Sequence, residues 1–143
     1  MTNIIMFIDF DYSENLVINK LRYSIYNIDG KLIKKYNDDD NNLIDYITDD
    51  LDLVDTVIGY NISSIIIDFY RLKNKIIIDK LNNKKKLCFK SIAKNHLKLI
   101  TSPSLQEIYN NLFKNRNIVE LDNLTICSEC YFEIIYNNCM KKK

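Results

Sequence analysis

The Asp29-Gly30 pair constrains the fold most, because it lies between two stretches that have the pattern of β-strands. Apolar and polar side chains alternate over residues 20–25, and residues 32–36 have the composition of a returning strand. Asp-Gly supplies the positive φ angles that a tight hairpin turn needs. Residues 4–8 form a continuous apolar run, which is typical of a central strand covered on both faces. The sequence therefore begins with three predicted antiparallel strands.

The rest of the chain alternates between helix and strand patterns. Asn61 is predicted to cap a helix with its side chain, and Ser104 and Glu107 have the spacing of a capping box at the start of another. Helices are predicted over residues 43–51, 62–72, 91–99, 104–113 and 120–138. Strands are predicted over residues 56–60 and 84–89. The residues between the helix 62–72 and the strand 84–89 are interpreted as a basic connector. We therefore predict an α/β protein with a mixed sheet flanked by helices, antiparallel at first and parallel later.

Composition indicates one globular domain over residues 1–143, with a short basic tail over 140–143. The chain has 143 residues, of which 47% are hydrophobic and 27% charged, so it can bury a real core. It has 2 Gly and 1 Pro, which is too few glycines for a glycine-rich, phosphate-binding loop. Heavy use of Asn, Ile, Lys and Tyr is typical of an AT-rich genome, such as that of a large DNA virus.

The net charge of +1 provides no global attraction to nucleic acid. Charge is segregated, however, with an acidic segment over 38–55 and a basic segment over 73–98. Within the basic segment, Lys84, Lys85 and Lys86 are the best candidates for contacts with phosphate. Any nucleic-acid binding is therefore expected to come from a local patch.

Neither a membrane span nor a signal peptide is indicated by the sequence. No apolar run approaches the roughly 20 residues that a spanning helix needs, and the N-terminus lacks the pattern of a cleavable leader. Four Cys without a secretion signal predict free thiols in a reducing compartment. We expect a cytoplasmic or intracellular protein without membrane contact, and homo-oligomers remain open.

The spacing of Cys127 and Cys130 is that of half a zinc site, which Cys88, His96 and Cys139 could complete. Zinc pairs usually lie on loops, whereas Cys127 and Cys130 lie inside a strongly helical pattern. We therefore interpret these two thiols as core residues and expect no zinc.

Two acids, Asp9 and Asp11, close the first predicted strand, and three further segments follow in a familiar order. These are residues 57–61, residues 102–109 and the final helix. The order resembles that of the DEDD-type 3′–5′ exonucleases, which have the ribonuclease H-like fold. The resemblance covers roughly residues 5–135. It implies the ribonuclease H-like version of the mixed sheet predicted above.

Members of this family hold two divalent metals between four carboxylates. The resemblance aligns Asp9-Phe10-Asp11 with the family's Asp-x-Glu, which implies weak binding of Mg²⁺ or Mn²⁺ through Asp9 and Asp11. The family's second motif, His-Asn-x-x-Phe-Asp, falls on residues 60–65. Asn61 matches and is expected to contact nucleic acid. Ile65 stands where the metal-binding Asp should be.

The family's third motif, His-x-x-x-x-Asp, aligns with Ile118 and Asn123. A slip of one residue would supply Asp122 as the acid, but it supplies no His. The Tyr of the other branch of the superfamily would fall on Val119. The resemblance therefore implies that the general base is missing, and loss of such a base costs roughly 10²–10⁴ in rate.

We expect an exonuclease-fold protein with a largely degraded two-metal site. Such a protein would bind single-stranded DNA or RNA, or act structurally with protein partners in a replication, repair or transcription assembly. One alternative is an active metal-dependent exonuclease that uses Asp9, Asp11, Asp122 and Asp68, which predicts that these acids converge. Another is a protein-binding module whose contact surface is the acidic segment 38–55. The leading expectation is that the protein is not an enzyme.

Overall fold

The computed structural model describes residues 4–11, 20–36, 43–113 and 122–141, with the backbone alone at residues 11, 20, 43 and 137–141. The strands are β1 (Ile4–Asp11), β2 (Lys20–Asn27), β3 (Leu32–Tyr36), β4 (Thr56–Gly59) and β5 (Lys85–Cys88). The helices are α1 (Leu43–Asp50), the 3₁₀ turn η1 (Leu51–Leu53), α2 (Ile62–Leu72), α3 (Lys75–Asn82), α4 (Phe89–His96), α5 (Leu105–Leu112) and α6 (Asn123–Lys141).

The described strands form one mixed sheet in the order β3-β2-β1-β4-β5. β1 pairs antiparallel with β2, and β2 pairs antiparallel with β3. β4 is parallel to β1, and β5 is parallel to β4. The predicted α/β class is therefore confirmed, as is the change from antiparallel to parallel pairing along the chain.

The hairpin between β2 and β3 is present, but its turn differs from the prediction. Among the described residues of this turn, Gly30 alone has a positive φ, of 86°, whereas Asp29 does not. The amide carbonyl of Asn27 accepts hydrogen bonds from the backbone N–H of Asp29 and of Lys31, at 3.0 and 2.9 Å. The side chain of Asn27 thus closes a wider loop, so the turn needs positive φ at one position only.

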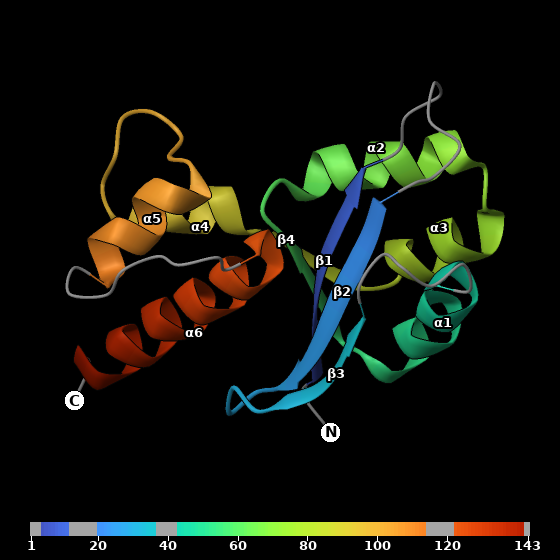
Figure 1. The fold of residues 1–143 in the computed structure, drawn as a ribbon, viewed down its shortest axis with the longest axis horizontal. Coiled ribbons are helices and arrows are strands. Elements are labelled where there is room, and N and C mark those ends of the chain that lie inside the picture. Colours follow the sequence, from blue (N-terminus) through green and yellow to red (C-terminus); the bar gives the residue numbers. More distant parts are fainter. Residues whose placement is uncertain (1–3, 12–19, 37–42, 114–121, 142–143) are drawn as a thin grey trace.

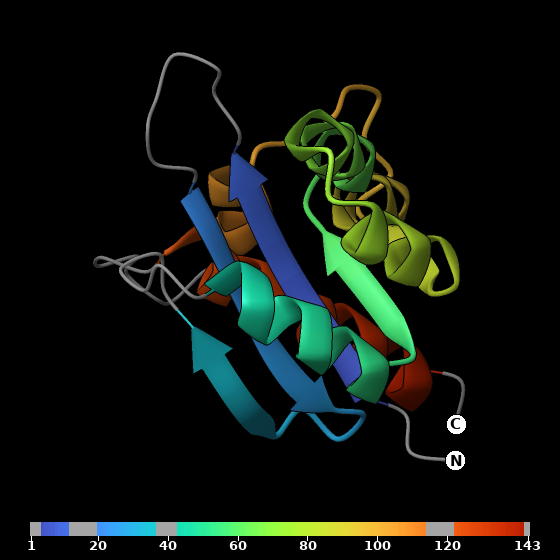
Figure 2. The same ribbon diagram turned by 90° about the vertical axis from the view of Figure 1, so that its right-hand side faces the viewer.

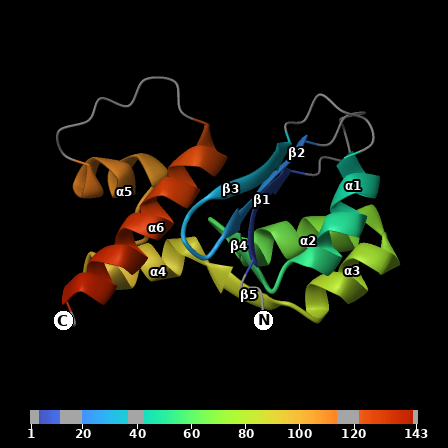
Figure 3. The same ribbon diagram turned by 90° about the horizontal axis from the view of Figure 1, so that it is seen from below.

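Helices cover both faces of the sheet (Figures 1 and 3). One face carries α1, α2 and α3, and Figure 2 looks onto this side, where α1 crosses in front of the strands. The other face carries α4, α5 and α6. Alternate residues of β1 enter the two cores: Met6 and Ile8 enter the first, and Ile5 and Phe7 enter the second. This explains the continuous apolar run, because a strand buried on both faces has no polar side.

Aromatic side chains anchor the two helical layers to β1. On the first face, Phe10 stacks on Phe69 of α2, with ring centroids 4.3 Å apart. On the second face, Phe7 makes edge contacts with Tyr131 and Phe132 of α6 at 5.6 and 5.7 Å. Such pairs contribute about 0.5–1.5 kcal/mol each beyond the area they bury. They hold α2 and α6 against opposite sides of the same strand.

Helix α3 was not predicted, because residues 73–83 were interpreted as a basic connector. The side chain of Asn74 accepts a hydrogen bond from the N–H of Ile77 at 3.1 Å, which is an N-cap. Ile77 and Leu81, four residues apart, are buried. The high lysine content of the segment hid this apolar pair.

The capping predictions had different outcomes. Ser104 accepts from the N–H of Glu107 at 3.1 Å, as the capping box predicts. Asn61 occupies the N-cap position of α2, but its side chain makes no capping hydrogen bond, so that prediction was wrong. The last helix was predicted over 120–138, and the described α6 begins at Asn123. The start predicted at residue 120 lies outside the described residues.

Candidate functional site

The ends of β1 and β4 bring Asp9 toward the start of α6. Alternation along β1 directs Asp9 to the same face of the sheet as Phe7, toward α4, α5 and α6. Asp9 is half-buried there. Asn123 and Cys127, one turn apart on α6, line the same small pocket as Asp9. The candidate site therefore joins residues that are more than a hundred positions apart in the chain.

The pocket at Asp9 is small and mostly apolar. Its volume is about 60 Å³, and its lining consists of Ile8, Asp9, Tyr60, Leu105, Asn123, Leu124 and Cys127. Pockets that enclose small-molecule ligands usually measure ≈ 300–1,000 Å³. The space therefore accommodates a few water molecules, and a nucleotide could approach it only from outside.

The side chains of α6 that face Asp9 are poor metal ligands. Asn123 is a neutral amide. Burial, followed by the neighbouring Cys130 and Asp9, raises the pKa of the Cys127 thiol well above its usual value. A thiol binds metal only after it loses its proton. The described residues of α6 thus contribute no carboxylate to the lining of the pocket at Asp9.

Arg22 stands directly opposite Asp9 in the antiparallel register of β1 and β2. Residues opposite each other in such a pair project from the same face of the sheet, with Cβ atoms about 4.5–5.5 Å apart. Arg22 is half-buried like Asp9. A guanidinium next to the carboxylate supplies the positive charge that a divalent metal supplies in a two-metal site.

Asp122 has a structural task at the start of α6. One carboxylate oxygen accepts from the N–H of Thr125 at 2.7 Å, which caps the helix. The other accepts from the ammonium of Lys35, on β3, at 3.1 Å. Partial burial by itself would raise the pKa of Asp122, but the hydrogen bonds from Thr125 and Lys35 outweigh it and lower the pKa. Asp122 is therefore ionised and bound by a lysine.

The two other acids of the predicted site cannot be added to this group. Asp11 is the last residue of β1 and pairs with Lys20, but its side chain lies outside the described part of the structure. Asp68 belongs to α2, which packs on the opposite face of the sheet from α6. In the described residues, no three His, Cys, Asp or Glu side chains come together in a way that could hold a metal ion.

Ile65, which the resemblance aligned with the family's second metal-binding acid, is part of the core. It is 6% exposed and packs under Gly59, where an added Cβ atom would lie 2.6 Å from its Cδ1 atom. The absence of a side chain on Gly59 thus allows α2 to approach β4 closely. An isoleucine in this position fills space and provides no ligand.

Tyr60, which follows β4, connects this strand to α4. Its hydroxyl donates to the backbone carbonyl of Pro103, and its own carbonyl accepts from the N–H of Lys90 at 2.9 Å. The ammonium of Lys90 lies 5.7 Å from the centroid of the Tyr60 ring. Asn61, the next residue, is exposed. A cation, an aromatic ring and an exposed amide therefore occur together at the end of β4.

Two of the three lysines predicted to contact phosphate, Lys85 and Lys86, project from opposite faces of β5. The ammonium of Lys86 donates to the backbone carbonyls of Leu81 and Lys84, each at 3.0 Å, at the end of α3. Lys85 projects from the opposite face of β5 and lines a separate pocket. Both lie near the start of β5, whereas Asn61 follows the end of β4. The structure therefore separates Asn61 from the lysines.

Three of the five described acids of the segment 38–55 are engaged within the fold. Asp50 is buried and accepts from Tyr23 at 2.8 Å and from Lys34 at 3.1 Å. Asp52 accepts from Lys80 at 3.0 Å, and Asp55 accepts from the N–H of Ile4 at 3.1 Å. Residues 38–42 lie outside the description. These contacts leave less free negative charge for a protein-binding face than the sequence suggested.

Cys127 and Cys130 are buried within α6, as their helical pattern predicted. Burial raises the pKa of Cys130 to about 12, so its thiol keeps its proton at neutral pH. Cys88 is half-buried at the start of α4, and its thiol donates to the carbonyl of Tyr60 at 3.5 Å. Cys139 has no described side chain.

Four residues near the candidate site were missed by the sequence reasoning: Arg22, Lys35, Lys90 and Cys127 in its role as a neighbour of Asp9. The alternation of β2 could have indicated Arg22, since this residue occupies the polar side of a half-covered strand. Lys35 and Lys90 carried no local signal, because their partners are defined by contacts between distant elements.

Comparisons with known proteins leave the chain without an assigned family. No family model, no curated protein and no solved structure matches it. Within the described residues, no helix has the length and apolar character needed to cross a membrane.

Proposed function

We propose that this chain is a ribonuclease H-like domain of the exonuclease type that no longer performs two-metal hydrolysis and acts by binding. Its partner would be single-stranded nucleic acid, within a replication, repair or transcription assembly. The strand order β3-β2-β1-β4-β5, with an antiparallel first half and helices on both faces, is consistent with that fold. Fold alone does not establish function, which depends on the residues at the end of β1.

The environment of Asp9 is the observation that carries the proposal. In a two-metal nuclease the carboxylate at this position faces further carboxylates across the bound ions. Here Asp9 shares its pocket with Asn123 and Cys127, and Arg22 lies opposite it on β2. Asp122, the nearest replacement in sequence, is bound by Lys35. Positive side chains thus stand next to the remaining acids, which disfavours the binding of divalent cations.

Groups at the end of β4, outside the small pocket, support a binding role. Lys90 can contact a phosphate, and its ammonium lies over the half-buried ring of Tyr60. Asn61 is exposed and can donate hydrogen bonds to a backbone or a base. With a net charge of +1, the affinity is expected to be modest and strongly dependent on salt.

Fluorescence anisotropy with end-labelled 20-nucleotide DNA and RNA, at low and moderate salt, tests the binding role. We expect Lys90→Met to weaken binding and to reduce the slope of log K against log salt by about 1. Lys75→Met, an exposed lysine on α3, is the matched control and should have little effect. Asp9→Asn should leave binding unchanged or strengthen it, because it removes a negative charge. Absence of binding to either oligonucleotide at low salt would contradict the proposal.

The same labelled strands, incubated with Mg²⁺ or Mn²⁺, test for catalysis. We expect intact substrate with the wild-type protein. Stepwise shortening from the 3′ end that disappears in Asp9→Ala would refute the loss of catalysis and favour the active alternative. Shortening that persists in Asp9→Ala would indicate a contaminating nuclease, and the preparation would be repurified before the assay is scored.

A further inference from the structure

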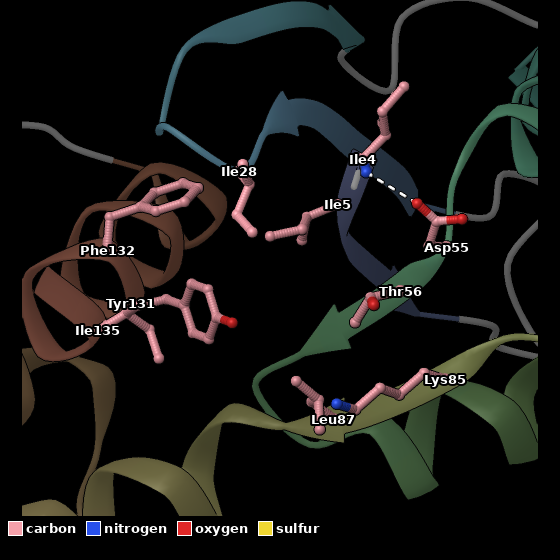
Figure 4. A pocket seen from close by; sticks show the side chains of 10 residues that line it. All are labelled: Ile4, Ile5, Ile28, Asp55, Thr56, Lys85, Leu87, Tyr131, Phe132 and Ile135. Carbon is pink, nitrogen blue, oxygen red and sulfur yellow. Dashed lines mark hydrogen bonds between the residues drawn. The ribbon is translucent and has the colours of Figure 1, made fainter. Parts of the chain in front are cut away.

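A second pocket opens at the other end of the sheet, where β1, β4 and β5 begin. Its volume is about 440 Å³, within the ≈ 300–1,000 Å³ range of small-molecule sites. Its lining consists of Ile4, Ile5, Ile28, Asp55, Thr56, Lys85, Leu87, Tyr131, Phe132 and Ile135 (Figure 4). None of these residues belongs to the pocket at Asp9, so the two sites are distinct.

The floor of this pocket is a row of side chains across three strands. In the parallel register Ile5 lies next to Thr56, and Thr56 lies next to Lys85. The neighbouring row, to which Phe7 belongs, is covered by Tyr131 and Phe132 of α6. Figures 1 and 3 show α6 running outward from the sheet toward its C-terminal end. The row formed by Ile5, Thr56 and Lys85 is therefore not fully covered by α6, and a wedge-shaped space opens between this row and the helix.

Most of the pocket wall is apolar. Seven of the ten lining side chains are isoleucine, leucine, tyrosine or phenylalanine, and they come from β1, β5, α6 and the turn after β2. Ile28 is 54% exposed at the edge of the pocket. An apolar ligand that covered it would gain about 25 cal/mol for each Å² of apolar surface removed from water.

Three polar groups face this apolar wall. In Figure 4 the hydroxyl of Tyr131 and the ammonium of Lys85 point toward each other from opposite sides, and the hydroxyl of Thr56 lies on β4 beside the Lys85 side chain. Within the described residues, no side-chain hydrogen bond or ion pair is formed by any of these three groups. The ring of Tyr131 is 9% exposed, and a tyrosine hydroxyl so placed usually has a hydrogen-bond partner.

The pocket lining contains one cation, Lys85, and one carboxylate, Asp55, and it is the cation that points toward the interior (Figure 4). Lys85 contributes a cation, whereas the carboxylate of Asp55 is turned away toward the backbone N–H of Ile4, which donates to it at 3.1 Å (Figure 4). A carboxylate could accept hydrogen bonds from the Lys85 ammonium and from the hydroxyls of Tyr131 and Thr56 together. Its apolar body would then lie against Ile5, Leu87 and Ile135.

We propose that this pocket binds a small monocarboxylate with an extended apolar body, such as a medium-chain fatty acid, independently of the nucleic-acid site. The carboxylate meets Lys85, Tyr131 and Thr56, and the hydrocarbon fills the wedge between α6 and the sheet. The cation of Lys85 favours a charged ligand over a neutral lipid. The pocket volume of about 440 Å³ fits one small molecule and not a membrane surface.

Isothermal titration of the full chain with decanoate, below its micellar concentration, tests the proposal. We expect one saturable site, with decanol, which has the same chain but no charge, binding at least tenfold more weakly. A tenfold change corresponds to about 1.4 kcal/mol, the lower end of what hydrogen bonds to charged groups contribute. Equal affinity for decanoate and decanol, or no binding of either, would overturn the proposal.

Variants test the assigned contacts. Lys85→Met keeps the length of the side chain but removes the charge, and should weaken decanoate binding about tenfold without affecting decanol. Tyr131→Phe should cause a smaller loss. Lys84→Met is the matched control, because Lys84 does not line the pocket, and it should bind decanoate normally. Unchanged affinity in Lys85→Met would overturn the assigned contact.

A pocket-filling variant distinguishes the interior from a surface effect. Ile135→Trp should abolish decanoate binding while the far-UV circular dichroism spectrum stays that of the wild type. If this variant does not fold, Lys85→Met still decides the question. Sedimentation of the ligand-free protein provides the last check. A dimer that Ile135→Trp dissociates would mean that a second copy covers the pocket, and would overturn the proposal.

Discussion

The carboxylate of Asp122 accepts a 3.1 Å hydrogen bond from the ammonium of Lys35, and this contact joins the first turn of α6 to the edge strand β3. The other oxygen of the same carboxylate caps α6 through the N–H of Thr125. An acid that could have served as a metal ligand is therefore used to place the last helix on the sheet. Replacement of Asp122 should therefore lower the stability of the fold even where it changes no activity.

Asp122→Ala should lower the free energy of unfolding by about 1 kcal/mol, the usual cost of losing an N-cap. Asp122→Asn keeps a capping side chain but loses the charge, so it should cost less, because a partly exposed ion pair contributes about 0–1 kcal/mol. Urea denaturation at pH 7 measures both. Asp79→Ala, an exposed acid on α3, is the control and should change stability by less than about 0.5 kcal/mol.

Asp122 should also make the stability of the protein depend on pH in the acid range. The pKa of Asp122 in the folded state is below its ordinary value of 3.8, so the ionised form favours folding. Its contribution is fully present above that value and is lost as the pH falls through the lower, folded-state pKa. The stability difference between wild type and Asp122→Asn should therefore shrink on going from pH 6 to pH 3. A difference that grows with acid would contradict the assignment.

A buried hydrogen bond from Tyr23 to Asp50, 2.8 Å long, predicts sensitivity to alkali. Burial, followed by this hydrogen bond, raises the pKa of Tyr23 far above its ordinary value of 10.0. Because the folded-state pKa is raised, the contribution to stability is present below pH 10 and is lost as the pH rises above it. The wild type should therefore lose stability above pH 10 more steeply than Tyr23→Phe does.

At pH 7 Tyr23→Phe should itself cost about 1.5–3 kcal/mol, since the lost hydrogen bond ends on a charged group. Tyr46→Phe is the control, because Tyr46 is 37% exposed and its hydroxyl has no hydrogen bond within the described part of the chain. Denaturant midpoints of the three proteins, taken at pH 7 and across pH 9–11, provide the comparison. Identical alkaline profiles for wild type and Tyr23→Phe would refute the role given to Tyr23.

Gly59→Ala should destabilise the contact between β4 and α2. The new Cβ atom would lie 2.6 Å from Cδ1 of Ile65 and 3.2 Å from Cδ1 of Ile62, so side chains would have to move. Overpacking of this kind typically costs about 1–3 kcal/mol. The double variant Gly59→Ala with Ile65→Val should recover part of the loss, because valine lacks that Cδ1 atom. Strictly additive effects in the double-mutant cycle would exclude the proposed clash.

The thiols should react in a defined order. Partial burial alone would raise the pKa of Cys88, but hydrogen bonds from Ser91, Ile62 and Lys90 outweigh it and lower the pKa. Burial keeps Cys127 and Cys130 protonated. In a Cys139→Ser background at pH 7.5, a disulfide reagent should therefore modify Cys88 first, since the thiolate is the reactive form.

The variant Ser91→Ala should slow the modification of Cys88, because it removes part of the stabilisation of the thiolate. Cys127 and Cys130 should react only when the protein is unfolded by urea. Mass spectrometry of the partly modified protein identifies the sites. Modification of Cys127 at the rate of Cys88 in the native state would mean that α6 is more open than the structure indicates.

Replacement of Lys86 and of Lys85, which are neighbours on β5, should have different effects on stability. Lys86→Met should lower stability by about 1 kcal/mol, because its ammonium binds carbonyl groups at the end of α3. Lys85→Met should leave stability unchanged, since Lys85 lines an open pocket. Thermal denaturation of the pair is a matched test, as the two changes are chemically the same. Equal melting temperatures would contradict the structural role of Lys86.

Local sequence patterns predicted most of the strands and helices, because each depends on the periodicity of its own side chains. The β3 strand was predicted with its observed bounds, and the capping box at Ser104 was predicted as well. The helix α3 was missed because only two of its side chains, Ile77 and Leu81, are fully buried. A short helix at the surface has a narrow apolar stripe, and a lysine-rich stretch hides it.

The sequence by itself determined that Ile65 and Asn123 offer no carboxylate, since the identity of a side chain needs no structure. It also determined that β1 would be buried on both faces, because residues 4–8 are all apolar. Only the tertiary structure decided which cations stand beside the acids. Arg22 faces Asp9 through a strand register, and Lys35 reaches Asp122 across 87 positions. Such contacts depend on how separate elements pack, and local periodicity carries no information about that.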